Sequence, residues 1–409
     1  MFKSAKFILF LTIFIDLLGF GIVIPILPIY VKSLTGSDFW TGMPVTLFAI
    51  AQFFFTPIWG ALSDKYGRRP IIITSLVFSI ISYLIFSFAT VFILVLAARV
   101  LSGIGAGNIS AAQAYISDTT EPKNRAKAMG MIGAAFGLGF IFGPPIGGFL
   151  MEDFGFHSIG LFCAGLCLLN IILVFFMLPE SLKEKRHDVK IKLLPIIDYK
   201  YVFSMKLMPY LMFIGFIYMA GFFLFQIPSS LLWKEHFGFS DKEISFVFGF
   251  IGISTAVVQG GLIGPFSKWF GERRLMLGGN LLLGLTVAVI PFVPVRLFVP
   301  LELILLFLLA VANGFVGPSI MSMLSQIAPP KEQGISLGIY QSFLSLARAA
   351  GPLMGGALYG IDYRVPYLTA FVIYVLNAVL VVRFLSKSKS VLGGGAVNHG
   401  DQSQNQQHA

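Results

Sequence analysis

Long apolar runs limit the possible folds of this sequence more than any other feature. Twelve of them follow one another along the 409-residue chain. Each has the length of about 18 to 25 residues that an α-helix needs to cross a lipid bilayer, whereas a membrane-spanning β-strand would alternate apolar and polar residues over about 10 positions. Apolar side chains make up 56% of the residues and charged ones only 12%, which is more hydrocarbon than a water-soluble core can hold. The sequence therefore predicts an all-α integral membrane protein with twelve transmembrane helices.

The first apolar run has features that separate a spanning helix from a secretory signal. Asp16 lies inside it, and no small-residue cleavage site follows it. We therefore interpret this run as the first span. To within a few residues at each end, the expected spans are 7–29, 40–62, 70–89, 91–115, 127–150, 158–178, 208–231, 243–266, 274–294, 298–322, 334–359 and 365–385.

The distribution of basic residues predicts which way the helices run. The net charge is +10, and most Lys and Arg residues fall in loops and tails on one side of the expected membrane. The opposite side holds only Lys32, Lys234, Lys242, Arg296 and Arg364. Because basic loops stay in the cytoplasm, we expect both termini there, in a multi-pass protein of the cytoplasmic membrane. The basicity then serves orientation, and we expect no nucleic-acid partner.

Two glycine patterns occur twice, which indicates a duplicated six-helix unit. GALSDKYGRR at 60–69 returns as GPFSKWFGER at 264–273, and GPPIGG at 143–148 returns as GPLMGG at 351–356. In each half the first pattern follows the second span, and the other lies within the fifth span. We therefore expect an N-terminal bundle at 1–180, a cytoplasmic linker at 181–207, a C-terminal bundle at 208–385 and a disordered cytoplasmic tail at 386–409.

These segments resemble the motifs of the major facilitator superfamily. The segment 60–69 matches the family's loop signature, RVLSGIGAG at 99–107 is similar to its fourth-helix arginine motif, and GPPIGG resembles its fifth-helix antiporter pattern. Asp16, followed by LLGFGIVIPILP, resembles the first helix of the twelve-span drug:proton antiporters, which include tetracycline exporters. The resemblance covers residues 7 to 385 and implies two pseudo-symmetric six-helix bundles that work by alternating access.

The resemblance gives the loop at 60–69 a gating role, in which charged residues latch the bundles together on the cytoplasmic side. The matching residues are Gly60, Asp64, Gly67, Arg68 and Asp118. Asp64 and Arg68 stand four residues apart and can pair on one helical face, while glycine suits a tight turn. The alternative is a solvated basic loop. Lys268 replaces the acid in the second copy, so we expect that copy to latch weakly.

The fifth-helix pattern is associated with antiport in the family. Its residues here are Gly143, Pro144, Gly147 and Gly148. Small residues let helices approach closely, and proline bends a helix. Ordinary helix packing is the alternative interpretation, because the second copy repeats the pattern.

Charged residues inside a span cost about 2.5–3.5 kcal/mol on insertion scales, so each should face a cavity or a partner. Asp16 and Arg99 both fall near the middle of their spans, where they can pair across the N-terminal half. We expect Asp16 to carry the coupling proton and Arg99 to tune it, with a structural ion pair as the alternative. Arg348 is a candidate for the substrate cavity, and Glu302, near the outer end of its span, is expected to be an exposed rim residue. One deep acid supports at most about one proton per cycle.

Uncharged polar residues within the spans are candidates for lining the pathway, with hydrogen bonding between helices as the alternative. Together with Arg348, the candidates are Gln113, Tyr115, Gln226, Asn313, Tyr340 and Gln341. The sequence has no nucleotide-binding GxxxxGK[ST] motif and no cluster of metal ligands, so we expect neither an enzyme nor a cofactor or metal. Cys163 and Cys167 are expected to serve in packing.

The function that the resemblance implies is a proton-coupled secondary transporter that exports small, amphipathic compounds. A dedicated symporter or uniporter of one endogenous metabolite, lipid or peptide is the alternative. The expected partners are a small-molecule substrate, protons and the lipid bilayer, and we expect a monomer. Tetracycline exporters carry further acids in their third and ninth helices, and the matching stretches here contain none. Tetracycline is therefore not the expected substrate.

Overall fold

The computed structural model describes residues 2–106, 108–120, 125–182, 203–205, 207–328 and 333–392. Within these ranges the regular structure is helical and contains no strand. The expected linker at 181–207 and tail at 386–409 lie largely outside the described residues. The last helix nevertheless continues to Leu392, so the first residues of the expected disordered tail are helical.

The helices of the N-terminal half coincide with the first six expected spans. They are α1 (Phe2–Val23), α2 (Leu27–Thr35), the 3₁₀ turn η1 (Phe39–Gly42), α3 (Met43–Tyr66), α4 (Arg68–Ser87), α5 (Phe92–Gly105), α6 (Asn108–Thr119), α7 (Arg125–Phe154) and α8 (Phe156–Met177). One of the expected spans is bent, because α1 and α2 meet at an angle of 44°. The helices α5 and α6 together form the fourth span, Phe92–Thr119.

The helices of the C-terminal half follow the remaining expected spans. They are α10 (Met208–Glu235), α11 (Asp241–Val257), the π-helix η3 (Val258–Leu262), α12 (Ile263–Val289), the 3₁₀ turns η4 (Ile290–Phe292) and η5 (Val295–Leu297), α13 (Phe298–Ile327), α14 (Gln333–Tyr359) and α15 (Val365–Leu392). Local sequence fixes some of these ends. Ser240 and Glu243 form a reciprocal capping box at the start of α11, which satisfies two backbone donors that the helix leaves open.

Length and hydropathy identify most of the expected spans independently. In the described part of the chain, 8 helices are long and apolar enough to cross a membrane, and 9 if the bent pair α1–α2 counts as one span. The stretch Asp241–Phe292 contains two spans, because the backbone leaves helical geometry at Gly271 (φ 74°, ψ 152°). The helices α7 and α14, which carry the glycine patterns, correspond to the remaining expected spans.

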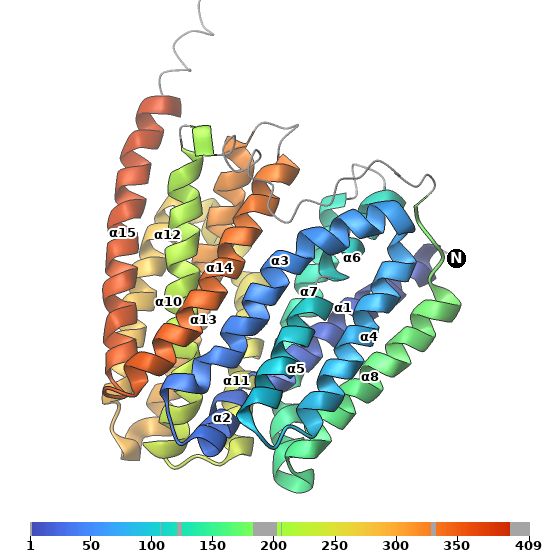
Figure 1. Ribbon diagram of the computed structural model, residues 1–409. Coiled ribbons are helices and arrows are strands. Elements are labelled where there is room, and N and C mark those ends of the chain that lie inside the picture. Colours follow the sequence, from blue (N-terminus) through green and yellow to red (C-terminus); the bar gives the residue numbers. More distant parts are fainter. Residues whose placement is uncertain are drawn as a thin grey trace, which may run out of the picture.

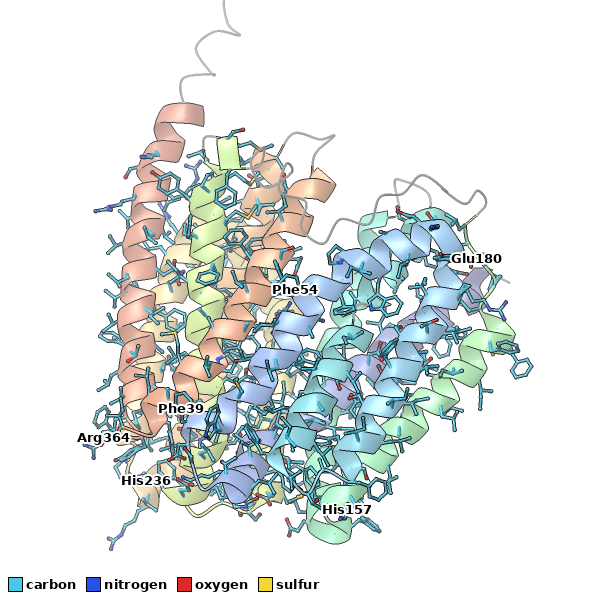
Figure 2. All side chains as sticks on the ribbon, in the orientation of Figure 1. Phe39, Phe54, His157, Glu180, His236 and Arg364 are labelled. Carbon is cyan, nitrogen blue, oxygen red and sulfur yellow. The ribbon has the colours of Figure 1, made fainter. Side chains whose placement is uncertain are left out.

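The helices form two bundles that lie side by side, α1–α8 in one and α10–α15 in the other (Figure 1). The turns at Gly67 and Gly271 lie at one end of the molecule, which we call the basic end. Glu180 is seen at this end in Figure 2, and His157 and His236 are seen at the other, which we call the opposite end. Large apolar side chains such as Phe176 (78% exposed) and Ile93 (67% exposed) cover the outside of the bundles, as expected of surfaces that face lipid.

Contacts between the bundles gather toward the opposite end. The helix α7 packs on α11, and α3 packs on α14. Thr46 Oγ1 donates a hydrogen bond to Ala349 O (2.7 Å), and both residues lie in the parts of α3 and α14 nearest that end. In Figure 1 the ribbons of the two bundles approach each other at the lower edge, which is the opposite end. The bundles are therefore joined at the opposite end in this arrangement.

Candidate functional site

The two charged residues predicted at mid-depth in the N-terminal bundle are Asp16 on α1 and Arg99 on α5, and Tyr83 of α4 contacts both of these helices. Asp16 is partly buried, whereas Arg99 is 3% exposed. A side chain at Gly19 would meet the Tyr83 hydroxyl, so this hydroxyl lies against α1, one turn after Asp16. On its other side, the ring of Tyr83 is contacted by the guanidinium of Arg99 (5.9 Å to the centroid). Tyr83, which the sequence analysis did not single out, thus connects Arg99 with the part of α1 that follows Asp16.

Arg99 is held by aromatic rings instead of a closed set of hydrogen bonds. Its guanidinium lies over the ring of Phe86 (4.8 Å to the centroid) and near that of Tyr83 (5.9 Å). A desolvated cation–π contact of this kind contributes about 2 kcal/mol. Its Nε and Nη2 are buried without hydrogen-bond partners among the described residues, which costs about 1–3 kcal/mol per group or more for a charged one. The cation–π contact offsets only part of this cost, and the guanidinium is left with two donors that an anionic group could bind.

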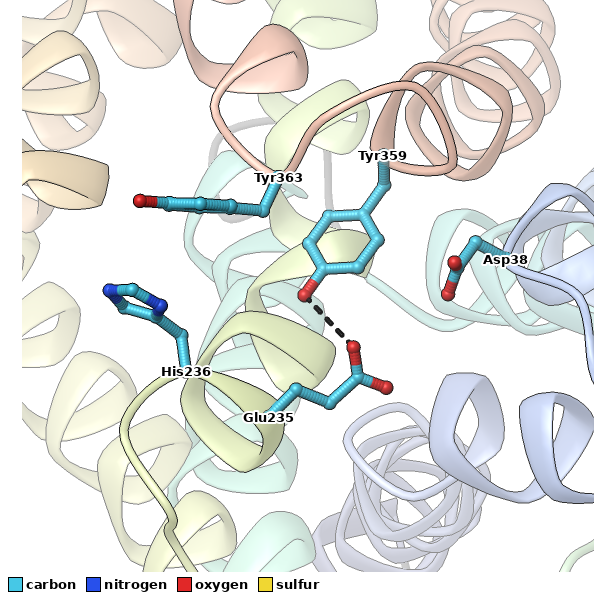
Figure 3. A pocket seen from close by; sticks show the side chains of 5 residues that line it. All are labelled: Asp38, Glu235, His236, Tyr359 and Tyr363. Carbon is cyan, nitrogen blue, oxygen red and sulfur yellow. Dashed lines mark hydrogen bonds between the residues drawn. The ribbon is translucent and has the colours of Figure 1, made fainter.

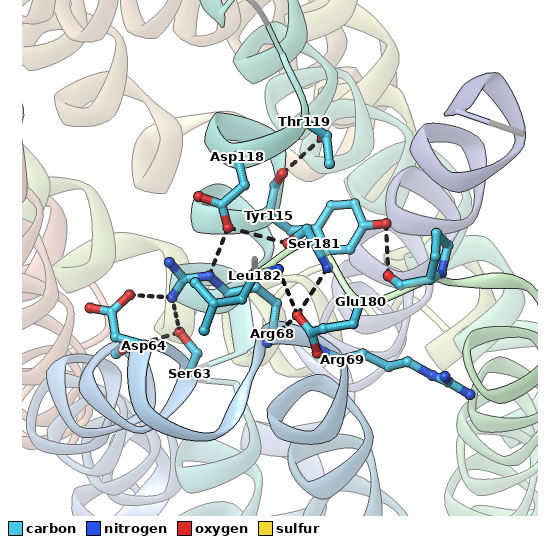
Figure 4. A network of polar contacts seen from close by, with 12 residues as sticks. Ser63, Asp64, Arg68, Arg69, Tyr115, Asp118, Thr119, Glu180, Ser181 and Leu182 are labelled. Atoms are coloured by element: carbon cyan, nitrogen blue, oxygen red, sulfur yellow. Dashed lines mark hydrogen bonds and ion pairs between the residues drawn. The ribbon is translucent and has the colours of Figure 1, made fainter. Parts of the chain in front are cut away.

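The predicted gating residues of the N-terminal bundle meet in one cluster at the basic end (Figure 4). Arg68 is 6% exposed. Its Nη1 lies 2.5 Å from Asp64 Oδ1, and its Nε lies 3.0 Å from Asp118 Oδ2. The pairing of Asp64, Arg68 and Asp118 thus has the geometry that the sequence motif suggests. We call these three residues and Glu180 the Arg68 cluster.

Glu180 is a member of this cluster that the sequence did not reveal. Its carboxylate accepts hydrogen bonds from the backbone N–H groups of Arg68 (2.9 Å) and Arg69 (3.1 Å), which are the first residues of α4. A negative charge at a helix N-terminus contributes about 0.3–1 kcal/mol. A side chain at Gly67, where φ is 114°, would come within 2.5 Å of Glu180 Oε2, so glycine is needed there for both conformation and space. At Gly60, by contrast, a Cβ would make only ordinary contact with Ser110 (3.7 Å).

The second copy of the loop keeps the geometry but changes the charges. Gly271 has a positive φ like Gly67, and Lys268 is exposed. The acid of this copy is Glu272, which accepts hydrogen bonds from the Ser322 hydroxyl and from Gln326 Nε2 (2.9 Å) near the basic end of α13. The expectation of a weak latch in the second copy was based on Lys268, and Glu272 bonds to α13 within its own bundle.

The repeated glycine patterns occupy equivalent places in the two bundles. A Cβ at Gly143 or Gly147 would overlap the α1 backbone (2.8 Å to Gly21 and 2.4 Å to Ile22 O), and Gly351 and Gly355 face α10 in the same manner. The last glycine of each pattern faces the other bundle. Gly148 packs on Ser245 of α11, and Gly356 packs on Asp38 and Thr41. Pro144 lies inside α7. These glycines let α7 pack closely on α1 of its own bundle and on α11 of the other bundle. In the same way, α14 packs on α10 and on the start of the α3 segment.

A charged cluster joins the bundles at the opposite end. Lys32 Nζ lies 2.6 Å from Asp38 Oδ1 in its own bundle and 2.5 Å from Glu235 Oε1 in the other. The Tyr359 hydroxyl donates to Glu235 Oε2 (3.4 Å). We call these four residues the Lys32 cluster. Beside it is an open hollow of about 250 Å³, also lined by His236 and Tyr363, whose rings stack (Figure 3).

The predicted pathway residues fall into two groups. Tyr115 and Tyr340 are buried in the cores of their bundles, and Tyr115 donates to Pro179 O (3.0 Å), an arrangement that suits packing. Asn313 Oδ1 accepts a hydrogen bond from the Tyr218 hydroxyl. The other four retain exposure or unpaired polar atoms. Gln113 and Gln341 are exposed. Within the described part of the chain, Gln226 Oε1 is buried without a partner, and Arg348 donates to Ser345 Oγ (2.7 Å) while its Nε has no partner. Cys163 and Cys167 are buried free thiols.

One prediction about a charged residue is wrong. Glu302, expected at an exposed rim, is 1% exposed. Trp233 of α10 donates a hydrogen bond to its Oε1 (3.1 Å). This contact comes from another helix, so the position of Glu302 along its own helix could not indicate it.

Comparisons with known proteins agree with this architecture. The sequence profile of the Major Facilitator Superfamily matches residues 9–294 and 211–398. Multidrug resistance protein 2 of Bacillus subtilis (strain 168) is 31% identical over 94% of this chain and 96% of that protein. The tetracycline resistance protein, class C, of Escherichia coli is 30% identical over 87% and 90%. The crystal structure of the human organic anion transporter MFSD10 (TETRAN) superposes with a TM-score of 0.72 at 25% identity, covering 93% of this chain and 99% of that one.

Proposed function

Because the chain belongs to the major facilitator superfamily, we propose that it is a proton-coupled secondary transporter that exports small, amphipathic compounds from the cytoplasm by alternating access. The matched relatives support export over the alternative of a dedicated metabolite symporter, because their names describe resistance to drugs. The two proposed moving parts are the N-terminal bundle (1–180) and the C-terminal bundle (208–385), with one copy of the chain as the working unit.

The observation that carries this proposal is the pair of charged side chains inside the N-terminal bundle. Asp16 is a carboxyl group within a membrane span on α1. The guanidinium of Arg99 contacts the ring of Tyr83 (5.9 Å to the centroid), and the Tyr83 hydroxyl lies against α1 one turn after Asp16. An acid in such a place can bind and release a proton as its hydration changes between states. If a substrate molecule competes with the proton for this region, the two fluxes become coupled.

The arrangement of the bundles supports an assignment of state. We propose that the basic end faces the cytoplasm, since its loops carry the Lys and Arg excess, and that both termini lie on that side of the cytoplasmic membrane. The opposite end then faces the outside, and we call it the outer end from here on. There the bundles are joined by the Lys32 cluster and by the α7–α11 and α3–α14 contacts. In this arrangement the ion pairs and hydrogen bonds of the Arg68 cluster connect residues 63–182 with one another, on the N-terminal side of the interface between the bundles. We therefore assign the structure to the inward-facing state, in which the cytoplasmic latch between bundles is disengaged.

Transport by purified protein in lipid vesicles tests the proposal. We expect vesicles that contain the parent protein to accumulate ethidium against its gradient when a pH gradient is imposed, and to lose this ability when a protonophore dissipates the gradient. Uphill transport that ignores the pH gradient would contradict proton coupling. Ethidium equilibration without any uphill phase would favour a uniporter.

A further inference from the structure

The C-terminal bundle contains a membrane-embedded cation, Arg348, whose hydrogen bonds are incomplete. It lies near the middle of α14 and is partly buried. Its Nη2 donates a hydrogen bond to Ser345 Oγ (2.7 Å), one turn earlier on the same helix. Its Nε is buried and has no hydrogen-bond partner among the described residues. The guanidinium is thus bonded to a neutral hydroxyl and keeps a donor without a partner, an arrangement that is costly inside a membrane span.

The helices packed against α14 place no acid beside Arg348 in the described part of the chain. These helices are α10, α13 and α15 of the same bundle and α3 with η1 of the other bundle. Neither α14 nor α15 contains Asp or Glu. The acids of the other helices, which lie near the helix ends and are bonded in the Arg68 cluster, in the Lys32 cluster or to an indole, are Asp64, Glu235 and Glu302. Asp16 lies on α1, which packs on α7 and α8.

The position of Arg348 on its helix directs the side chain between two neighbouring helices. The helix α14 lies between α10 and α3 (Figure 1). Gly351 packs on α10, and Gly356 packs on Asp38 and Thr41, just before the start of α3. With 3.6 residues per turn, Arg348 falls between these two lines of contact. It therefore points to the space that α10 of one bundle and α3 of the other enclose.

The two sides of α14 differ as expected of a helix that separates lipid from a polar space. Leu346 (47% exposed) and Met354 (46% exposed) lie on the side away from Arg348, where apolar side chains suit lipid. On the side of Arg348, Gln341 lies two turns nearer the basic end and is exposed. The guanidinium extends in the same direction, because helical side chains tilt toward the helix N-terminus and Arg348 bonds to Ser345. The charge therefore faces the side that is open to the cytoplasm in the inward-facing state.

An anionic group of a ligand would complete the bonds of this guanidinium. A carboxylate accepts two parallel N–H bonds from an arginine fork, and the unpaired Nε with an adjacent Nη group forms one such pair of donors. We propose that Arg348 binds the carboxylate of an amphipathic substrate between the bundles. This inference rests on the proposed export function and deepens it, because it names amphipathic carboxylates as a class of substrate.

A matched pair of probes tests this assignment. Dansyl-phenylalanine carries a carboxylate, and its primary amide is neutral and otherwise the same. Binding to the purified full-length protein in lipid nanodiscs is measured by dansyl fluorescence at neutral pH in a chloride-free buffer, with empty nanodiscs as the blank. We expect the parent protein to bind the acid more tightly than the amide. Arg348→Gln should weaken binding of the acid about tenfold or more, since hydrogen bonds to a charged group are lost, and should change binding of the amide less than about twofold.

Two further variants separate recognition of the carboxylate from effects on folding. Arg348→Lys keeps the charge but lacks the planar pair of donors, so its affinity for the acid should lie between those of the parent protein and Arg348→Gln. Arg296→Gln, at an exposed arginine of η5 between α12 and α13, is the matched control and should leave both affinities unchanged.

Two results would overturn the inference. A parent protein that binds the acid no more tightly than the amide, or binds neither, does not recognise a carboxylate. Equal losses of affinity for the acid and the amide in Arg348→Gln would mean that Arg348 has a structural role. Neither measurement uses a pH gradient, so both are independent of ethidium transport. Ethidium transport that ignores the pH gradient is a different outcome, because it overturns the proposed proton coupling and leaves the comparison of the two probes intact.

Discussion

The Lys32 cluster should set part of the balance between the two arrangements of the bundles. Lys32 bridges Asp38 of its own bundle and Glu235 of the other. Lys32→Met removes this bridge and leaves the two carboxylates near each other across the interface. Glu235→Gln removes the bridge but creates no such repulsion. Both variants should therefore favour the outward-open arrangement, Lys32→Met more strongly than Glu235→Gln.

The exposure of the pair sets the size of this effect. Lys32 and Glu235 side chains are 28% and 39% exposed, so water and salt screen their attraction, and pairs of this kind contribute about 0.2–1 kcal/mol. A loss of about 1 kcal/mol corresponds to a factor of about five in the population of the outward-open arrangement. The effect should shrink as the ionic strength is raised, because the cluster is partly exposed.

Thiol accessibility measures this population. Ser245 is buried where α11 meets Gly148 of α7, so Ser245→Cys should react with an impermeant thiol reagent only when the outer end opens. We expect Lys32→Met to accelerate this reaction about fivefold. Lys234→Met is the matched control, because Lys234 forms an ion pair of similar length with Asp241 inside one bundle. Equal acceleration by both variants, or no acceleration by Lys32→Met, would refute the role of the cluster in joining the bundles.

Three further predictions concern the basic end and its orientation. Glu272→Gln should slow transport more than Lys268→Ala, because Glu272 holds hydrogen bonds to α13 whereas Lys268 is exposed; equal initial rates of ethidium transport would contradict this. Gly67→Ala should lower the unfolding temperature, since a strained backbone of this kind costs on the order of 1–3 kcal/mol, and an unchanged melting curve would show that the turn relaxes. A cysteine introduced at Glu152 should react with impermeant reagents in intact cells and one at Lys268 only after permeabilisation; the reverse labelling would invert the proposed orientation.

Local sequence patterns predicted the helices and the repeated glycine contacts well, for a physical reason. The period and length of apolar runs follow from the bilayer itself, and a glycine pattern reports a close backbone approach wherever it recurs. The turn at Gly67 and the pairing of Asp64 with Arg68 are likewise local, because the residues are close in sequence. These features needed no knowledge of which helices become neighbours.

Residues whose roles depend on distant partners were missed or misplaced. Glu180 caps α4 from the end of α8, far along the chain, and Tyr83 reaches α1 and α5 from a third helix. Glu302 was expected at the rim because only its position near the end of its own span could be read from the sequence. It is instead buried and accepts a hydrogen bond from Trp233 of α10. The second loop was expected to latch weakly because Lys268 replaces the acid, and the hydrogen bonds of Glu272 to α13 were not foreseen. In each case tertiary packing determines the environment, and one sequence does not specify that packing.

Proton-driven transport by Asp16→Asn tests the central claim most directly. The substitution keeps the shape of the side chain and removes its titration. In vesicles, the variant should fail to accumulate ethidium against its gradient when a pH gradient is imposed, because the substrate no longer competes with a proton at this position. It should still exchange ethidium between compartments of equal concentration, which shows that binding and alternating access persist. Accumulation by Asp16→Asn equal to that of the parent protein would contradict the assignment of Asp16 as the coupling residue.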